Sequence, residues 1–294
     1  MRPPQQNPPP VSVTTPTGLR LHSIQTGWVA VKAAHRQFTG PDGTGLAAIA
    51  LDPRWTEWLP IHTWVIEHPE GMIVIDTGET ARMAEKDYTT CDPGTNFFYR
   101  SFLRFNVTPE EEIGAQLRTL GIPPAEVRWV VQTHLHSDHV GGLSAFSQSD
   151  VLVPSQDYPS ALGTLYCRYP DWLNPTRVEF TPGHLPGHLP HFPRTKSLTR
   201  AGDVLIVPTP GHTEGHQSVV LLDGDTTYFF AGDTSFTEAQ LLAGKLGGIA
   251  LKPREGRETM RQIRAYAGSR PTVYLPSHDP DSRRRLLEQA TIQS

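Results

Sequence analysis

The chain has 294 residues, which is enough for one large α/β domain or two small ones with a sizeable core. With 37% hydrophobic and 19% charged residues, its composition is typical of a globular domain and not of a disordered chain. The formal net charge of −4 gives no electrostatic basis for binding nucleic acid or an anionic membrane, so we expect neither as a partner. No run of about 18 apolar residues occurs, and a membrane span is therefore not expected.

Residues 1–18 form a proline-rich segment that has no apolar centre of the kind found in a secretory signal. Proline at this density disfavours a helix or a central strand. We expect an extended arm, disordered or lying over a neighbour, followed by one folded domain over residues 19–294.

The chain contains two cysteines, Cys91 and Cys167. Two cysteines do not imply a disulfide framework, so buried free thiols and a cytoplasmic location are the expectation.

The first strong strand signals lie in residues 19–34 and 61–76. In the second of these, the apolar runs IHTWVIEH and MIVID are separated by Pro-Glu-Gly, which predicts a β-hairpin.

A helix is predicted to begin after Thr108. Thr108 is the expected N-cap, Pro109 takes the first helical position, and Glu111 completes a capping box. Gly121 is expected to end this helix. Its predicted apolar face comprises Ile113, Leu117 and Leu120.

Further strands are predicted at 127–132, 203–208, 217–223, 226–232 and 271–276, with helices at 254–268 and 281–290. Each short motif of histidine or aspartate follows one of these strands. Polar groups on loops at the ends of rigid strands are where functional sites usually lie. The sequence therefore predicts a mixed α/β sandwich with a site at its strand ends.

The segment HLHSDH places His134, His136, Asp138 and His139 within six residues. Imidazole and carboxylate groups suit zinc and neighbouring transition metals. His134 and His136 are two residues apart and point the same way in an extended chain, whereas Asp138 and His139 can face a second ion. A polar loop with chance histidines is the alternative, and this composition makes it improbable.

The remaining ligands must come from elsewhere in the chain, and TPGHLPGH (181–188) and TPGHTEGH (209–216) are competing near-copies. His212, in the second copy, lies between two strong strands, whereas the first copy lies in a proline-rich stretch that we expect to be a surface loop. His216 is expected to support a ligand by a hydrogen bond and not to bind metal itself. The full set of candidates is His184, His188, His191, His212, His216, Asp233 and His278.

The motifs HLHSDHVGG, TPGHTEGHQS, AGDT and PSHD, in this order, resemble those of the metallo-β-lactamase superfamily over roughly residues 20–290. This resemblance implies an α/β fold, a four-layer αββα sandwich, with a hydrolase domain over 19–294. It also implies two divalent metal ions, with zinc favoured over manganese, iron or cobalt. By the same resemblance, Asp76 would support the site. The implied metal ligands are His134, His136 and His212 at one ion, Asp138, His139 and His278 at the other, and Asp233 between them.

Among the branches of the superfamily, the chain looks most similar to the N-acyl homoserine lactone lactonases, the quorum-quenching branch. Those enzymes usually carry a tyrosine three residues after the bridging aspartate, where this chain has Phe236. Phenylalanine has no hydroxyl to donate, so a slower reaction with acyl homoserine lactones is expected unless another group compensates.

The implied reaction is ring opening of a lactone by attack of a metal-bridging hydroxide, with catalytic roles for Asp138, as proton donor to the leaving oxygen, and for Asp233. A phosphotriesterase or arylesterase with the same two-metal site is the alternative, and Phe236 favours it slightly. A purely structural metal module is disfavoured, because a structural zinc site closes with four ligands.

The substrate is expected to be a small-molecule ester or lactone. Residues 95–105 and 54–58 are aromatic and are candidates for its acyl pocket, with Phe98, Phe105 and Phe236 as substrate-binding residues. The alternative for these aromatic groups is core packing or a dimer contact. Because the related lactonases include dimers, a homodimer is preferred over a monomer.

Overall fold

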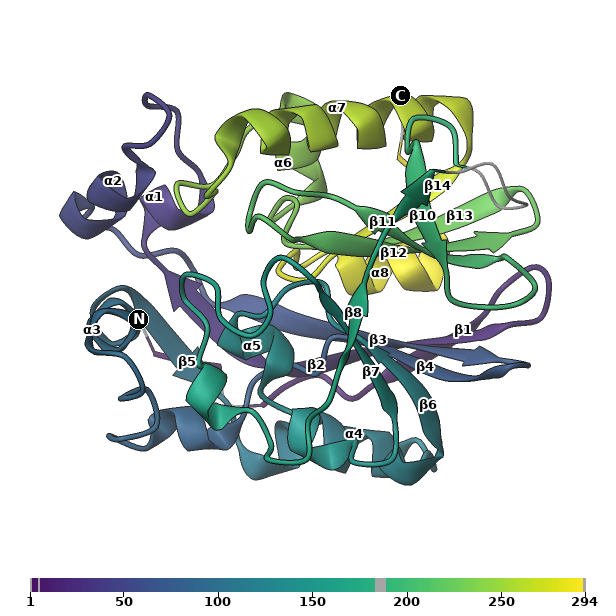
Figure 1. The fold of residues 1–294 in the computed structure, drawn as a ribbon, viewed down its shortest axis with the longest axis horizontal. Coiled ribbons are helices and arrows are strands. Elements are labelled where there is room, and N and C mark those ends of the chain that lie inside the picture. The colour runs from purple at the N-terminus through teal and green to yellow at the C-terminus, as the bar shows by residue number, and fades with distance from the viewer. Residues whose placement is uncertain (1, 5, 183–188, 293–294) are drawn as a thin grey trace.

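The structure is a computed structural model and describes residues 2–4, 6–182 and 189–292. Two sheets lie face to face, with helices on both outer faces (Figure 1). Helices α6 (Glu238–Ala243) and α7 (Pro253–Ser269) cover one sheet, and α4 (Ile113–Thr119) covers the other. The expected four-layer αββα sandwich is therefore confirmed.

The larger sheet has eight strands in the order β1-β2-β3-β4-β6-β7-β8, with β5 paired to β2. The pairs β4–β6, β6–β7 and β7–β8 are parallel, and the others are antiparallel. The predicted hairpin is formed by β3 and β4. The strands are β1 (Val11–Thr14), β2 (Arg20–Val31), β3 (Leu59–His68), β4 (Gly71–Ile75), β5 (Leu103–Asn106), β6 (Val127–Val131), β7 (Asp150–Pro154) and β8 (Thr176–Val178).

Within the described residues, the smaller sheet has six strands in the order β14-β13-β12-β11-β10-β9. The pair β13–β14 is parallel, and the other neighbouring pairs are antiparallel. The predicted strands at 203–208, 217–223, 226–232 and 271–276 are all present here. The strands are β9 (Thr181–Pro182), β10 (Arg194–Ser197), β11 (Val204–Pro208), β12 (Gln217–Asp223), β13 (Thr226–Gly232) and β14 (Thr272–Pro276).

Alternating side chains build the three interfaces between the layers. Along β3, Trp64 and Ile66 face the other sheet, whereas Val65 faces α4. Along β11, Ile206 faces the space between the sheets, and Val207 packs under α7. Because side chains in a strand alternate between the two faces, strands that are apolar throughout are buried on both sides. The remaining helices are α1 (Ala33–Arg36), α2 (Gly45–Leu51), α3 (Pro93–Phe102), α5 (Ser137–Val140) and α8 (Ser282–Glu288).

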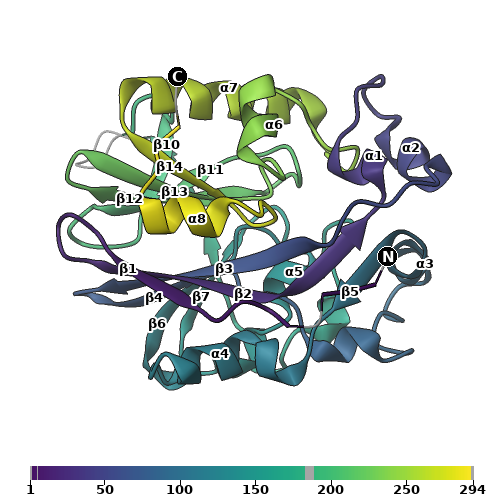
Figure 2. The same ribbon diagram turned by 180° about the vertical axis from the view of Figure 1, so that it is seen from behind.

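The proline-rich arm is partly ordered against the domain. Residues Val11–Thr14 form β1, which pairs antiparallel with β2 at the edge of the larger sheet (Figure 2). Closer to the N-terminus, the side chain of Asn7 donates to the carbonyl oxygen of Gln25 at 2.8 Å. An edge strand tolerates nearby prolines because one side of it needs no hydrogen-bond donors. The arm thus lies along its own domain.

The helix predicted after Thr108 is divided in two. A 3₁₀ turn spans Pro109–Glu111, Glu112 is extended, and α4 begins at Ile113. The carboxylate of Glu112 accepts hydrogen bonds from the hydroxyl of Thr80 and from the backbone N–H of Ala81, both at 2.9 Å. The expected capping contact is present, since the carboxylate of Glu111 accepts the N–H of Thr108 at 2.8 Å. A tertiary contact interrupts a helix that the local sequence favours.

The expectation of two free thiols is wrong, because Cys91 and Cys167 form a disulfide. Cys91 precedes α3, and Cys167 lies in a 3₁₀ turn at Tyr166–Arg168. The bond joins two segments 76 residues apart, which spacing in the sequence does not predict. The argument for a cytoplasmic location from free thiols no longer holds, and that location stays a prediction. Among the described helices, none is long and apolar enough to cross a bilayer.

Candidate metal centre

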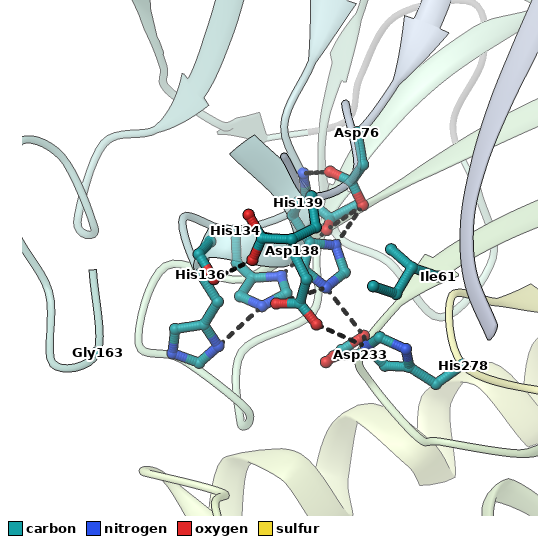
Figure 3. A network of polar contacts seen from close by, with 12 residues as sticks. Ile61, Asp76, His134, His136, Asp138, His139, Gly163, Asp233 and His278 are labelled. Carbon is teal, nitrogen blue, oxygen red and sulfur yellow. Dashed lines mark hydrogen bonds and ion pairs between the residues drawn. The ribbon is translucent and has the colours of Figure 1, made fainter. Parts of the chain in front are cut away.

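The site lies where four strands of the two sheets end. Asp76 directly follows β4, and His134 follows β6 after a short turn. In the other sheet, Asp233 directly follows β13, and His278 lies two residues beyond β14. Because β4 pairs parallel with β6, and β13 with β14, the ends of each pair lie at the same edge of their sheet. Figure 3 shows these side chains converging from both sheets.

Backbone contacts hold the two sheets together at this end. The N–H of Gln217 donates to the carbonyl oxygen of Thr133 at 2.9 Å, and the N–H of His62 donates to that of Ser277 at 2.9 Å. Gly232, the last residue of β13, has a φ of 55°, in the left-handed region. A Cβ at Gly232 would lie 2.7 Å from the side chain of Thr133, so this position requires glycine if Asp233 is to reach the site.

Three imidazoles form the first donor triad. Nδ1 of His136 lies 3.0 Å from Nε2 of His134 and 3.0 Å from Nε2 of His212. The three potential ligand atoms all lie within 4.8 Å of one another. His134 and His136 come from the turn after β6, and His212 comes from the loop between β11 and β12. The structure therefore brings together three nitrogens that the sequence places in two separate motifs.

Asp138, His139 and His278 form the second donor triad. Nε2 of His278 lies 3.4 Å from Oδ2 of Asp138, and Nε2 of His139 lies 3.9 Å from Oδ1 of the same carboxylate. Asp138 and His139 are held on the short helix α5, and all three side chains are buried. Their potential ligand atoms also lie within 4.8 Å of one another.

Asp233 lies between the two triads. Its Oδ2 is 3.4 Å from Nε2 of His212, in the first triad. Its Oδ1 is 3.5 Å from Nε2 of His139 and 3.4 Å from Nε2 of His278, in the second triad. Each carboxylate oxygen thus faces a different triad, which is the arrangement needed to bridge two ions.

Hydrogen bonds to backbone carbonyls determine which nitrogen of two histidines faces the site. Nδ1 of His278 lies 2.9 Å from the carbonyl oxygen of Pro60, and Nε2 of His136 lies 3.3 Å from that of Leu162. A carbonyl oxygen only accepts, so these nitrogens carry the proton in the neutral ring. Nε2 of His278 and Nδ1 of His136 are therefore left with lone pairs directed into the site.

Asp76 positions His139 in the same way. Its Oδ2 lies 2.8 Å from Nδ1 of His139, and its Oδ1 accepts the backbone N–H of Thr133 at 2.7 Å. This leaves Nε2 of His139 free to face Asp233 and Asp138. Asp76 itself lies outside both triads, as the sequence comparison with the superfamily implied.

The electrostatics of the two triads differ. Burial, followed by repulsion from His139 and His136, lowers the pKa of His134 well below its ordinary value, and the ring is neutral at pH 7. Burial also opposes protonation of His139, but the carboxylates of Asp233, Asp76 and Asp138 outweigh it and raise the pKa of that ring well above the ordinary value. The carboxylates around the second triad therefore favour a positive charge there. Either a proton or a metal ion can supply that charge.

Two orphaned polar atoms test whether these residues fit a metal. Nε2 of His139 and Oδ1 of Asp233 are buried and have no hydrogen-bond partner among the described residues. Buried polar atoms are rarely left unpaired, since each such group costs about 1–3 kcal/mol. Imidazole nitrogens and carboxylate oxygens match zinc and neighbouring transition metals, so the donor set fits such ions.

The other histidine candidates lie outside the triads. His216 holds Asp233 in place, because its Nε2 accepts the backbone N–H of Asp233 at 3.0 Å. This agrees with the supporting role expected for it. His191 is exposed on the surface. His184 and His188 lie outside the described residues.

An apolar cavity of about 270 Å³ opens onto the cluster. Phe98 and Phe236, both expected at the substrate, contribute to its wall. The ring of Phe236 stacks on that of His278, with centroids 5.3 Å apart. The polar floor is formed by His136, Asp138, His212, Asp233 and His278.

Phe105 does not line this cavity, contrary to expectation. Its ring stacks on Tyr99, with centroids 6.1 Å apart, and lines a second pocket of about 260 Å³. Tyr99 and Leu103 border both spaces. Trp55 is also absent from the cavity wall, since it packs under the guanidinium of Arg104. In both cases aromatic character is present in the sequence, but the direction of the side chain is set by packing.

Two polar residues of the cavity wall, His35 on α1 and Asp92 at the N-cap of α3, belong to none of the candidate sets drawn from the sequence, and His35 is the farther of the two from them. It belongs to no motif and lies about a hundred residues before the first histidine cluster. No spacing or periodicity identifies it, because only the fold brings α1 to the site.

Residues 56–278 match the sequence pattern of the metallo-beta-lactamase superfamily. The N-acyl homoserine lactonase AttM of Agrobacterium fabrum (strain C58) is 25% identical over 273 residues, covering 90% of this chain and 95% of that protein. The N-acyl homoserine lactonase AiiA of Bacillus thuringiensis subsp. kurstaki is 29% identical over 181 residues, covering 56% and 69%. A probable metallo-hydrolase of Mycobacterium tuberculosis, Rv2300c, is 29% identical over 188 residues, covering 61% and 58%.

Solved structures share the fold at lower sequence identity. An N-acyl homoserine lactone hydrolase with the product N-hexanoyl-L-homoserine at its catalytic metal centre superposes with a TM-score of 0.70 at 18% identity, covering 90% of this chain and 94% of that one. The hydrolase AbOPH superposes with a TM-score of 0.60 at 14% identity, covering 95% and 92%. The expectation of a metal-dependent hydrolase is confirmed. The chain belongs to the metallo-beta-lactamase superfamily.

Proposed function

We propose that the protein opens lactone rings, with N-acyl homoserine lactones as the substrate class, using two divalent metal ions. The observation that carries this proposal is the carboxylate of Asp233, whose two oxygens face two different donor triads at the floor of an apolar cavity. Relatives named N-acyl homoserine lactonase, matched over 90% of the chain, support the substrate class.

Two sets of residues would hold the ions. His134, His136 and His212 would bind one, Asp138, His139 and His278 the other, and Asp233 both. Divalent ions held there would lower the pKa of a bound water and would polarise the ester carbonyl. Zinc is favoured by the ligand types, with manganese, iron or cobalt as alternatives.

Asp138 is proposed to transfer the proton from the attacking water to the leaving oxygen. When the ring opens, the ester C–O bond breaks, and the departing alkoxide oxygen must gain a proton to become the hydroxyl of the product. Asp138 lines the cavity, and its Oδ2 lies 3.4 Å from Nε2 of His278. Its carboxyl group can therefore take a proton from the attacking water and deliver it to the alkoxide.

The apolar wall of the cavity would hold the acyl chain. Val29, Val31, Phe98 and Ile249 contribute to it, and the wall is continuous with the polar floor. Transfer of an alkyl chain from water to such a surface contributes roughly 0.8 kcal/mol for each buried CH₂ group. The cavity is thus suited to a substrate with a reactive polar head and an apolar tail.

Phe236 favours a second candidate, a phosphotriesterase or arylesterase. The residue is 4% exposed, and its ring stacks on that of His278 and offers no hydrogen-bond donor. An aromatic wall beside the site suits an aryl leaving group, which needs no such donor.

The test is a comparison of substrates on the zinc-loaded protein. Ring opening of short- and long-chain acyl homoserine lactones is followed by proton release, beside an aryl ester and a phosphotriester. Fast lactone turnover supports the proposal, whereas clear ester or triester cleavage with negligible lactone turnover supports the second candidate. Asp233→Ala, with its fold verified by circular dichroism, is the control and should lose all of these activities.

A homodimer stays a prediction. Leu51 and Phe97 are large apolar side chains that are exposed on the chain. Such groups are enriched at subunit contacts but also occur singly on monomers. Light scattering on the purified protein tests the assembly directly.

A further inference from the structure

His35 is a buried histidine in the wall of the active-site cavity, outside both donor triads. The short helix α1 carries it, and its side chain lines the cavity together with Phe236 and Asp233. Only 5% of the residue is exposed. Its Nδ1 is buried and has no hydrogen-bond partner among the described residues.

Other polar side chains in the same wall are already engaged. The hydroxyl of Tyr99 donates to the carbonyl oxygen of Gly163 at 2.8 Å and accepts the N–H of Ser137 at 3.3 Å. The carboxylate of Asp92 accepts the backbone N–H of Thr95. Because Nδ1 of His35 has no partner among the described residues, no neighbouring group fixes which ring nitrogen carries the proton. The ring lines the cavity, so the nitrogen on the cavity side can carry that proton and donate it to a molecule there.

Aromatic neighbours fix the position of the His35 ring. It meets Phe236 edge-on, with centroids 5.9 Å apart, and lies 6.1 Å from the ring of Phe98. Phe236 stacks in turn on His278, at 5.3 Å. The ring of Phe236 thus packs against both His35 and His278, which links His35 to the second triad through an apolar group.

The ring is neutral at pH 7. Burial of the ring, and next electrostatic repulsion from His136, lower the pKa of His35 to about 3. A neutral imidazole carries one N–H donor and one acceptor nitrogen. An amide carries the complementary pair, a carbonyl acceptor and an N–H donor. In an acyl homoserine lactone, this amide is attached to the carbon next to the reacting ester carbonyl, on the side of the acyl chain.

We propose that His35 is a specificity-determining residue that donates its imidazole N–H to the amide carbonyl oxygen of an N-acyl homoserine lactone. This inference rests on the proposed function. It places the ester at the donor triads, the amide beside His35, and the acyl chain along the apolar wall. His35 distinguishes lactones that carry an acylamino group from those that lack one.

The test compares N-hexanoyl homoserine lactone with γ-butyrolactone, which has the ring but no amide. His35→Phe removes the donor and keeps an aromatic ring, and His35→Gln keeps a donor. We expect His35→Phe to lower kcat/KM for the acylated lactone by about 10–100-fold and for γ-butyrolactone by less than about twofold, because a site built to hydrogen-bond a substrate discriminates strongly against its loss. His35→Gln should retain more of the selectivity.

A matched control is His22→Phe. His22 is also buried, but it lies on β2 and bonds to Glu67 and Ser12, and it does not line the cavity. This control should leave the ratio of the two kcat/KM values unchanged. Metal content is measured on every variant, so that a loss of ions is not mistaken for a loss of substrate contact.

Two results would overturn the assignment of His35: an unchanged selectivity in His35→Phe, or an equal loss on both lactones at full metal content. If the wild type opens neither lactone but cleaves the aryl ester or phosphotriester, the proposed function fails separately. The assignment is then decided by calorimetric titration with N-hexanoyl-L-homoserine. A fall of about tenfold in its affinity in His35→Phe supports the amide contact, and an unchanged affinity rejects it.

Discussion

Nδ1 of His139 lies 2.8 Å from Oδ2 of Asp76, and both side chains are only 1% exposed. This contact fixes the orientation of the imidazole, so that its other nitrogen faces Asp233. The orientation of a proposed metal ligand therefore depends on a residue that lies outside both donor triads.

Asp76→Asn tests this dependence. The backbone of Asp76 has φ of 58°, a left-handed conformation that asparagine tolerates better than most residues. The amide removes one acceptor oxygen and the negative charge, so we expect metal affinity at the second triad to fall about 10–100-fold. Competition with a chromogenic chelator measures this change. An unchanged affinity for both ions would reject the supporting role of Asp76.

Metal binding should stabilise the fold. Without ions, Nε2 of His139 and Oδ1 of Asp233 are buried without hydrogen-bond partners among the described residues. At free zinc about 1,000 times its Kd, the free energy of unfolding should rise by about 4 kcal/mol relative to chelator-treated protein. Urea unfolding with and without zinc measures the difference. Coincident curves for the wild type would contradict a metal site here, and Asp233→Ala should show a smaller shift than the wild type.

The disulfide between Cys91 and Cys167 should stabilise the wall of the cavity. It joins the segment before α3, which carries Phe98, to the turn at Tyr166–Arg168. Closing so long a loop restricts the unfolded chain, and the double substitution to serine should lower the free energy of unfolding by roughly 2–4 kcal/mol. Urea unfolding measures it, with dithiothreitol-treated wild type as the matched control. Equal stability of oxidised and reduced protein would show that the bond contributes nothing.

Glu70 should make stability depend on pH. This residue lies in the β3–β4 turn, and its carboxylate accepts the backbone N–H groups of Arg200 and Ala201 at 3.0 and 2.9 Å. These hydrogen bonds lower the pKa of Glu70 from 4.5 to about 2. Because the folded-state pKa is depressed, the stabilisation is fully present above pH 4.5 and is lost as the pH falls towards 2.

Glu70→Gln should therefore be less stable than the wild type at pH 7, with the difference shrinking steadily below pH 4.5. Urea unfolding of both proteins at several pH values measures this difference. Glu258→Gln is the control, because Glu258 is an exposed carboxylate whose partner among the described residues is the neighbouring side chain of Arg261. A constant difference between wild type and Glu70→Gln from pH 7 to 3 would show that the carboxylate charge is not involved.

Much of the fold could be predicted because strand signals are local. The apolar runs around Val65 and Val207 are buried on both faces, and their β-branched side chains mark strands without any tertiary information. The helix after Thr108 shows where local signals fail. Its capping box forms as expected, but Glu112 bonds to Thr80 and Ala81, and the chain leaves the helical conformation there.

The sequence alone determined which residue types meet at the site. The motif HLHSDH is contiguous, and His212, Asp233 and His278 each follow a strand that the local sequence predicts. Tertiary structure decided which nitrogen of each ring faces inward, through partners such as Pro60 that no motif includes. It also decided that the two cysteines pair, that Phe105 lies outside the cavity, and that His35 lines the cavity wall. The physical reason is the separation along the chain over which each interaction acts. Periodicity and capping act between neighbours in the chain, whereas ring orientation, disulfide pairing and cavity lining depend on contacts between segments that only the packed sheets bring together.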